Sequence, residues 1–296
     1  MNGFLNLLKP PGMSSGACAA VVKRLTGERV GHAGTLDPEA AGVLPIMVGR
    51  ATRLLDHLPD KSKSYAAEIA FSGATDTQDA QGKVIEAAVR VPEREEIEKA
   101  LGAFRGMILQ RPPAYSALKQ NGVPLYALAR KGQAVETKAR ETEIRSLELG
   151  EKTGPDGYML RVDCGSGTYI RTLCHDIGQA LGAPAHMRFL LRTRHGAFSI
   201  ADSVTIEETV QAAEEGRLEK LLLPLDWPLQ ALPRIVLPEK FVKAGRNGGK
   251  LPAGLSPELR DGEKCRVYYN DALLGIVHRD GDVLRFDVGL TGGSEG

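Results

Sequence analysis

Apolar residues recur with two different periods along this chain, and both periods occur in its first two thirds. Every second residue is apolar or aromatic at 65–71 and again at 158–164, which is typical of strands with one buried face. Helical spacing is present at 97–104 and at 170–181, and Gly182 supplies a stop signal after the second of these segments. Strand and helix patterns that intermix in this way indicate an α+β protein.

Capping and turn residues set the limits of other expected elements. A helix is expected at 15–25, where Gly27 ends it, and the capping box formed by Thr205 and Glu208 begins a later helix. Three prolines then cluster within residues 224–233. Because proline clusters interrupt regular elements, we place a domain boundary there.

The last part of the chain contains strand patterns separated by hairpin turns. Asn270-Asp271 separates two such segments, and Asp280-Gly281 precedes a third. The expected strands lie at 264–269, 272–278 and 283–288. We therefore predict two domains, a large one at 1–228 and a small all-β module at 229–296.

Charge is distributed unevenly, although the net charge is only +1. Residues 101–140 contain seven Lys or Arg side chains and one acidic side chain, whereas residues 201–220 contain six acidic side chains and two basic ones. A localised basic stretch is compatible with a binding site for a polyanion, and equally with two ordinary solvated faces. Charge alone does not decide between these interpretations.

The cysteines and the apolar runs argue against several classes of protein. No C-x-x-C pair occurs, so a zinc site is not expected. The four cysteines are Cys18, Cys164, Cys174 and Cys265. The apolar run at residues 1–8 is too short for a signal peptide, and no run reaches the length of a membrane span. We expect reduced thiols and a cytoplasmic protein that does not bind membranes.

The densest group of turn-forming residues lies at 31–45 and contains Asp37. Three glycines and an Asp-Pro step imply a tightly turned backbone that another chain or a ligand approaches closely. Catalytic side chains are often held in constrained loops of this kind. From spacing alone, Asp37 is either a candidate catalytic carboxylate or simply the residue that starts a turn before Pro38.

Residues 31–44 resemble the signature of the TruB family of pseudouridine synthases, G-H-x-G-x-L-D-P-x-A-x-G-x-L, at every fixed position. The chain departs from the family pattern at Leu8, where Asp is frequent, and at Gly165, where Ser is usual. Further segments resemble family motifs, in the family's order, at 9–15, 63–65, 73–82, 112–130 and 164–171.

The resemblance implies an enzyme that isomerises a uridine in the T-loop of tRNA, at conventional position 55. The implied fold is a pseudouridine synthase-like mixed, mainly antiparallel sheet with flanking helices, followed by a small PUA-like RNA-binding domain. The reaction breaks the glycosidic C–N bond, turns the uracil and joins C5 to the ribose. Because no redox change occurs, we expect no cofactor and no metal. Asp37 would attack C1′ of the ribose or C6 of the uracil, or would assist an elimination.

The resemblance implies three catalytic residues, Asp37, Tyr65 and Arg171. Arg171 falls in the first turn of an expected helix, where a cation opposes the helix dipole, so an anionic partner is expected. The resemblance makes that partner Asp37, and the alternatives are a phosphate or plain surface exposure. Tyr65 lies on the apolar face of its strand, where it is either a core residue or the residue that stacks on the target uracil.

Six residues are expected to bind the substrate: His32, Lys9, Lys119, Arg130, Lys131 and Arg192. By resemblance, His32 helps to displace the target base from its stack. Lys9 has a supporting role near the site or contacts a phosphate. Three of the basic residues belong to a loop at about 108–138 that folds over the RNA, with a short helix near 125–129. Arg192 and Arg194 alternate like one face of a strand that contacts RNA.

The expected partner is the T-arm of tRNA, bound by a stand-alone monomer without an obligate protein partner. A guide-dependent synthase of H/ACA particles is the nearest alternative in chemistry, although the basic segment and the short tail favour the stand-alone enzyme. An RNA chaperone is the alternative from another class. A glycoside hydrolase with two carboxylates is a third, with Glu39 and Asp76 as candidates for the second carboxylate.

Overall fold

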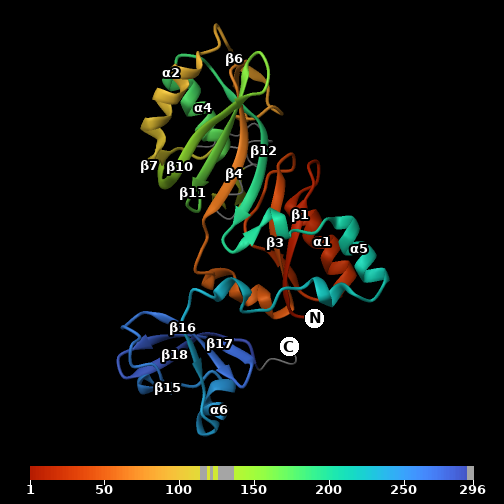
Figure 1. The fold of residues 1–296 in the computed structure, drawn as a ribbon, viewed down its shortest axis with the longest axis vertical. Helices are drawn as coiled ribbons and strands as arrows, with labels where there is room; N and C mark the ends of the chain where they lie inside the picture. The colour runs from red at the N-terminus through yellow and green to blue at the C-terminus, as the bar shows by residue number, and fades with distance from the viewer. Residues whose placement is uncertain (114–118, 121–122, 126–136, 292–296) are drawn as a thin grey trace.

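A computed structural model describes residues 1–113, 119–120, 123–125 and 137–291 of the chain. These residues form a large sheet and a smaller C-terminal sheet, which occupy different ends of an elongated molecule (Figure 1). The order across the large sheet is β1 (Gly3–Lys9), β3 (Ala41–Val48), β12 (His186–His195), β4 (Lys63–Ala70), β11 (Gly157–Cys164), β10 (Arg140–Lys152) and β7 (Gly106–Gln110). Neighbours in this order are antiparallel except β3 and β12, so the expected mainly antiparallel sheet is confirmed.

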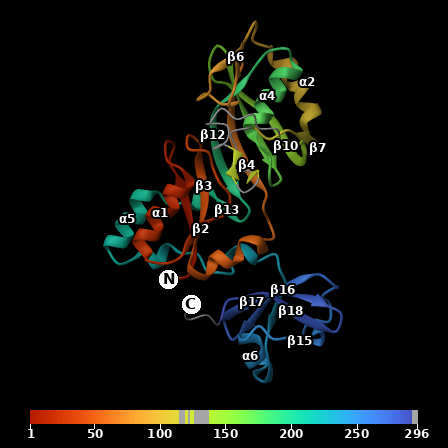
Figure 2. The ribbon, with the colours of Figure 1, turned by 180° about the vertical axis from the view of Figure 1, so that it is seen from behind.

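Helices cover the large sheet in two groups (Figures 1 and 2). The first group lies beside β1 and β3 and consists of α1 (Ser15–Thr26) and α5 (Ile206–Glu214). The second group consists of α2 (Arg94–Leu101), which packs on β10, and α4 (Ile170–Ala180), which packs on β12 and β4. The helix α1 ends at Gly27, whose φ of 69° is left-handed, and Thr205 with Glu208 forms the expected capping box before α5. The helices expected at these positions are confirmed.

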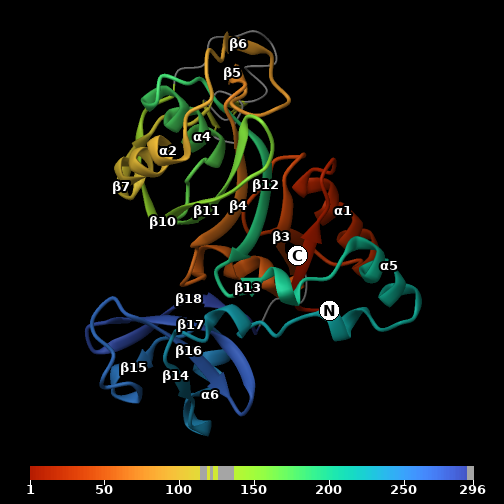
Figure 3. The ribbon, with the colours of Figure 1, turned by 45° about the horizontal axis from the view of Figure 1, so that its top comes forward.

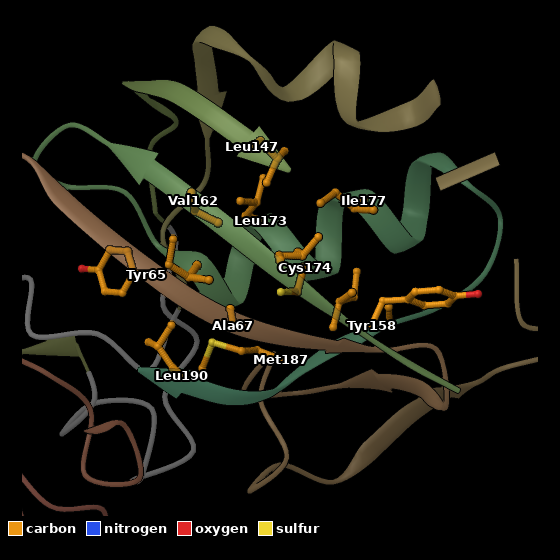
Figure 4. Packing of buried hydrophobic residues seen from close by; sticks show 14 of the residues in the cluster. Tyr65, Ala67, Leu147, Tyr158, Val162, Leu173, Cys174, Ile177, Met187 and Leu190 are labelled. Carbon is orange, nitrogen blue, oxygen red and sulfur yellow. The ribbon is translucent and has the colours of Figure 1, made fainter. Parts of the chain in front are cut away.

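The alternating residues of β4 and β11 form one core with the helices α2 and α4. Figure 4 shows Ala67 of β4 and Val162 of β11 in this cluster, together with Leu173 and Ile177 of α4. Successive side chains of a strand point to opposite faces, so every second residue reaches the core. Tyr65 lies at one end of the cluster, where the core meets the pocket described below (Figure 4).

The strand β1 is buried on both faces and separates two further cores. Leu5 and Leu7 pack with residues of α1 and β3, whereas Phe4 belongs to a cluster that includes Leu54 of the 3₁₀ helix η1 (Gly49–His57). A strand with two buried faces gives a continuous apolar run. The alternating period that marked the other strands is therefore missing from residues 3–8.

The C-terminal sheet has the order β14 (Arg234–Val236), β16 (Lys264–Tyr269), β17 (Ala272–Asp280), β18 (Val283–Gly289) and β15 (Leu251–Pro252). The three strands expected here are confirmed, and Asn270 turns between β16 and β17 with a φ of 51°. The expectation of an all-β module is wrong, because α6 (Glu239–Arg246) contributes Phe241 and Ala244 to the core of this sheet. A helix of eight residues is too short for its period to stand out in the sequence.

Short elements complete the described part of the chain. The strand β2 (Val30–His32) pairs with β3, and β13 (Phe198–Ser199) pairs with β12. Two small hairpins pair β5 (Gly73–Thr75) with β6 (Val84–Ala87) and β8 (Lys119–Gln120) with β9 (Val123–Pro124). The first hairpin lies close to β12 (Figure 3). The remaining 3₁₀ helices are η2 (Gly102–Phe104), η3 (Ile200–Asp202), η4 (Leu218–Leu221), η5 (Trp227–Leu229) and η6 (Ala253–Leu255).

One apolar cluster joins the two sheets. It contains Phe4 and Leu54 from the first part of the chain, Leu229 from the connection, and Ile276 and Val288 from β17 and β18. The C-terminal sheet therefore packs against η1 through side chains rather than hanging from a free linker.

Gly42 lies where β3 and β12 run parallel, opposite Arg192. Its φ is +113°, and a Cβ atom added at this position would overlap the carbonyl oxygen of Arg192. We expect Gly42→Ala to lower the free energy of unfolding by about 3 kcal/mol or more, because backbone on one side must move, and urea unfolding measures the loss. Gly27→Ala is the matched control, since its added Cβ would meet no atom within 4 Å, and we expect it to cost about 1–2 kcal/mol. Equal losses would show that the Arg192 carbonyl does not matter.

Candidate active site

Asp37 lies in the loop between β2 and β3, and the segment after β1 holds this loop in place. Ser15 Oγ accepts a hydrogen bond from the Leu36 N–H (2.8 Å) and donates one to the Leu36 carbonyl oxygen (2.9 Å). The Gly12 N–H donates to the Pro38 carbonyl oxygen (2.9 Å). Two motifs that are distant in sequence therefore form one rigid support for the carboxylate.

Lys9 is buried beneath the same loop, with 0% of its surface exposed. Its Nζ donates to the carbonyl oxygens of Pro10 (2.8 Å), Pro38 (2.8 Å) and Ala40 (2.6 Å), so all three ammonium donors are used. Burial lowers the pKa of Lys9 below its ordinary value. The phosphate contact considered for Lys9 is wrong, because the side chain does not reach solvent. Its supporting role fits, because it fixes the backbone that follows Asp37.

Arg171 reaches Asp37 from the first turn of α4. Its Nε lies 2.9 Å from Asp37 Oδ2, and its Nη2 donates to Asp37 Oδ1 at 3.3 Å. Both carboxylate oxygens thus face one guanidinium, whose planar group fits a bidentate contact. The ion pair that the sequence suggested is present, and it supplies the anion expected beside a cation at a helix N-terminus.

A second carboxylate, that of Asp79, shares the same guanidinium. Arg171 Nη1 lies 3.5 Å from Asp79 Oδ2 and donates to the Thr77 carbonyl oxygen at 3.1 Å. Gln78, which lies between Thr77 and Asp79 in the sequence, has a φ of +64°. Its side chain accepts a hydrogen bond from the Thr172 hydroxyl of α4 (2.8 Å). This role was not expected from the sequence, because the motif that contains Asp79 shows no local sign that it turns back onto α4.

The surroundings of Asp37 favour its protonated form relative to a free aspartate. Burial raises the pKa of the Asp37 carboxyl above its ordinary value of 3.8, and the opposing effect of Arg171 does not fully offset it. Asp79 adds to the increase and Lys9 opposes it. The side chain is still 40% exposed, so solvent and substrate reach it. A carboxylate with a raised pKa is a stronger base once it is ionised.

Tyr65 both closes the apolar core and borders the pocket. It is 7% exposed and lies near Val162 and Leu190 at one end of the cluster (Figure 4). Burial raises the pKa of its hydroxyl to about 12, and the charge of Arg192 nearby opposes part of this increase. The core and the pocket interpretations of Tyr65 are therefore compatible with each other.

Arg192 is fully buried beneath the Asp37 loop. Its Nε donates to the Val43 carbonyl oxygen (2.7 Å) and its Nη2 donates to the Gly34 carbonyl oxygen (3.0 Å). The predicted RNA contact of Arg192 is wrong, because 0% of this residue is exposed and its donors are used inside the protein. A register shift in β12 lies between Arg192 and Arg194, and Arg194 binds Ser64 Oγ instead (3.0 Å). The simple alternation assumed for the two arginines fails at this irregularity.

The side chains of these segments surround a pocket of about 320 Å³. It brings together Asp37, Tyr65 and Arg171, the three expected catalytic residues, from three separate segments. The remaining wall is formed by Gly34, Thr35, Leu36, Lys63, Gly167, Thr168, Tyr169, Ile170 and Leu190. Lys63 and Leu190 were not expected at the site, since a single strand pattern does not tell which end of the strand borders a cavity.

His32 lies on β2, opposite Ile46 of β3, and does not belong to the pocket wall. Its Nδ1 is buried and has no hydrogen-bond partner among the described residues. Burial and the charge of Arg192 lower its pKa, so the ring is neutral near pH 7. The expected role of His32 in displacing the base stays a prediction.

The basic loop expected at about 108–138 is described only in part. Arg130 and Lys131 lie outside the described residues, as does most of the helix expected near 125–129. Lys119 belongs to β8, but its side chain is likewise outside the described part. The predicted phosphate contacts of these three residues therefore stay predictions.

The second carboxylate of a hydrolase is not found where it was considered. Glu39 and Asp76 are both exposed, and neither belongs to the pocket wall. Asp76 Oδ1 accepts a hydrogen bond from the Lys83 N–H (2.8 Å), which is a turn role. Asp79 is nearer to the site, but its carboxylate is paired with Arg171. The arrangement fits one reactive carboxylate rather than two.

The described ranges contain no group of three or more His, Cys, Asp or Glu side chains that could hold a metal ion. The four cysteines are buried free thiols. Across the same ranges, every helix is too short or too polar to cross a membrane.

Comparison with known proteins relates most of the chain to one family. The sequence model of the TruB family pseudouridylate synthase N-terminal domain matches residues 23–170, and that of the tRNA pseudouridylate synthase B C-terminal domain matches residues 171–230. tRNA pseudouridine synthase B of Heliobacterium modesticaldum is 41% identical over 285 residues, which cover 93% of this chain and 90% of that protein. The protein of the same name from Geobacillus thermodenitrificans is 43% identical over 268 residues, which cover 86% and 88%.

Solved structures show the same fold. An H/ACA ribonucleoprotein bound to a substrate RNA containing 2′-deoxyuridine contains a chain with a TM-score of 0.74 and 25% identity, covering 98% of this chain and 85% of that one. A Cbf5–Nop10–Gar1 complex contains one with a TM-score of 0.73 and 27% identity, with the same coverage of 98% and 85%. Fold and site thus define a pseudouridine synthase, an isomerase. The chain belongs to the TruB family of pseudouridylate synthases.

Proposed function

We propose that this synthase isomerises a uridine in the T-loop of tRNA, at conventional position 55, and that Asp37 is its catalytic carboxylate. The observation that carries the proposal is the Asp37–Arg171 pair in a pocket that also presents Tyr65. The relatives with 41% and 43% identity are named as tRNA pseudouridine synthases, which supports tRNA as the substrate here.

Asp37 supplies the reactive group that cleavage of the glycosidic bond requires. Its carboxylate attacks C1′ of the ribose or C6 of the uracil, or assists an elimination. In each route the C1′–N1 bond breaks and a C1′–C5 bond forms, C5 loses a proton and N1 gains one, so the product is an isomer. Arg171 holds the carboxylate through two contacts, which fixes its direction of attack.

A flipped uracil would occupy the pocket beside Tyr65 and Leu190. The target base must leave its stack before a protein side chain reaches the glycosidic bond. Aromatic and apolar side chains on the wall replace part of the lost stacking. With a pKa of about 12, Tyr65 keeps its proton near neutral pH, so it serves the C5 proton step as a relay, with the charge of Arg192 stabilising any phenolate.

We divide the chain near residue 228 and assign RNA contacts to the module at 229–296 and to the basic loop at about 108–138. The enzyme acts as a stand-alone cytoplasmic monomer in this proposal. The chain is 41% identical to a tRNA pseudouridine synthase, but only 25% and 27% identical to the chains from H/ACA complexes. This difference favours stand-alone action over guide-dependent action. The buried free thiols fit a reducing compartment.

Tritium release from tRNA labelled at uridine C5 tests the proposed function. The purified protein alone, with EDTA present, is expected to release the tritium of a single uridine in each tRNA molecule, and a transcript with cytidine at that position should release none. Release from another uridine would move the proposed position. Binding of tRNA without release would favour a chaperone, and release only after addition of a guide RNA would favour guide-dependent action.

A further inference from the structure

The region around the Asp37 loop contains cations that pair with no carboxylate in the part of the chain that the structure describes. Lys9 and Arg192 are each 0% exposed, and backbone carbonyl oxygens accept their hydrogen bonds. Lys63 is a third such cation, whereas Arg171 is balanced by Asp37 and a second carboxylate. Positive charge therefore exceeds negative charge around the pocket, and such a pocket attracts an anion.

Lys63 is the member of this group that borders the pocket. It begins β4, two residues before Tyr65, and its Cε lies 3.7 Å from the place that a Cβ atom of Gly34 would occupy. Its side chain thus packs on the loop that carries Asp37. Nζ donates to the Lys61 carbonyl oxygen at 3.0 Å, which leaves two of its three donors without a partner among the described residues.

The surroundings of Lys63 disfavour its charge until an anion binds. Burial and the charge of Arg192 lower the pKa of Lys63 to about 8. The titratable and charged groups that face it are Arg192 and His195 on β12, Cys164 on β11, and Asp60 and Lys61 on its own segment. A bound anion would restore the ammonium form, so Lys63 gains from contact with a negatively charged part of the substrate.

We propose that Lys63 binds a non-bridging oxygen of the phosphodiester next to the flipped nucleotide. This inference rests on the proposed function in that the substrate is RNA, whose anionic groups near neutral pH are its phosphates. A uracil carbonyl oxygen is the competing partner for the ammonium. A uracil carbonyl carries no charge, so removing the charge of a phosphate would weaken the phosphate contact but not the carbonyl contact.

A neutral methylphosphonate, placed in turn at each linkage that flanks the target uridine in a T-arm RNA, tests the contact. Binding is measured in the Asp37→Asn background, so that the RNA is not converted. At one of these linkages, we expect the methylphosphonate to weaken RNA binding about tenfold in the Asp37→Asn protein that retains Lys63. A loss of this size is typical of one charged hydrogen bond. Lys63→Met should bind the unmodified RNA about tenfold more weakly and lose nothing further with the methylphosphonate.

Lys61→Met is the matched control. It removes the same charge two residues away, from a side chain outside the pocket wall. The backbone carbonyl that holds Lys63 is retained in this variant. We therefore expect Lys61→Met to keep the full methylphosphonate effect.

Lys63→Arg adds a second readout. Between pH 7 and pH 9 the lysine ammonium, with a pKa of about 8 in the free enzyme, is progressively lost, so RNA affinity should fall as pH rises. Arginine stays charged over this range, so the affinity of Lys63→Arg should stay nearly constant. This variant also keeps the test available if Lys63→Met does not fold, which the unfolding midpoint would show.

The proposal would be overturned if the losses of RNA affinity were additive. In that case each methylphosphonate would weaken RNA binding by Lys63→Met as much as it weakens binding by the protein that retains Lys63. An equal pH dependence in Lys63→Arg would also overturn it. Turnover of the same unmodified RNA by the wild-type enzyme distinguishes failure of the proposed function from failure of the Lys63 contact. Absence of turnover overturns the proposed function, whereas turnover with additive losses overturns only the Lys63 contact.

Discussion

Asp37→Asn is expected to reduce turnover at least about ten-thousandfold, because an amide neither attacks carbon nor accepts a proton as a carboxylate does. RNA binding should change little, since the amide keeps the size of the side chain. Tritium release under single-turnover conditions measures the rate, and filter binding measures the affinity. Residual release within tenfold of the wild type would mean that another group supplies the chemistry.

The same substitution is expected to leave the folded protein at least as stable at pH 7. The pKa of Asp37 is raised in the folded state, so its protonated form is the one that folding favours. The contribution is fully present below the unfolded pKa near 3.8 and is lost as pH rises through the higher folded value. The ionised carboxylate at pH 7 therefore lowers stability, and asparagine removes that effect. A lower unfolding midpoint for Asp37→Asn at pH 7 would contradict this sign.

Arg171→Met is the second substitution with a large expected effect. It leaves the carboxylates of Asp37 and Asp79 without the cation that they share, so the folded protein should be less stable than the wild type. The pKa of Asp37 should rise further, so the acidic limb of the pH–rate profile should move to higher pH. Activity at pH 7 should fall about a hundredfold or more, because the carboxylate also loses its orientation.

Two control variants separate charge from structure in this experiment. Arg171→Lys keeps the cation but loses the bidentate geometry, so we expect an acidic limb near that of the wild type with a reduced rate. Arg188→Met removes an arginine that also bridges two carboxylates, those of Glu68 and Asp156, outside the pocket. It should retain full activity. Loss of activity in Arg188→Met equal to that in Arg171→Met would show that the effect is general destabilisation.

Elements with a regular period could be predicted from the sequence. The strand at β4, the strand at β11 and the helix α4 each present one buried face, and the period reports that face directly. The Asp37–Arg171 pair could also be expected, because a cation in a first helical turn favours an anionic partner and the family resemblance made Asp37 that partner.

Burial of the other cations could not be predicted from local pattern. Lys9 and Arg192 have the appearance of phosphate contacts, yet both are enclosed by carbonyl oxygens gathered from other segments. The partners become neighbours only when β1, β3 and β12 assemble. Asp79 was missed for the same reason, since it meets Arg171 through a left-handed turn at Gln78.

The apolar cluster between η1 and the C-terminal sheet has a consequence for any attempt to shorten the enzyme. A chain cut near residue 228 would remove Leu229, Ile276 and Val288 from the cluster that contains Phe4 and Leu54, and each large apolar side chain that this uncovers costs about 1.5–3 kcal/mol. The module at 229–296 therefore also covers apolar side chains of the catalytic half. Evolution could not exchange it for another module without rebuilding the patch that it covers.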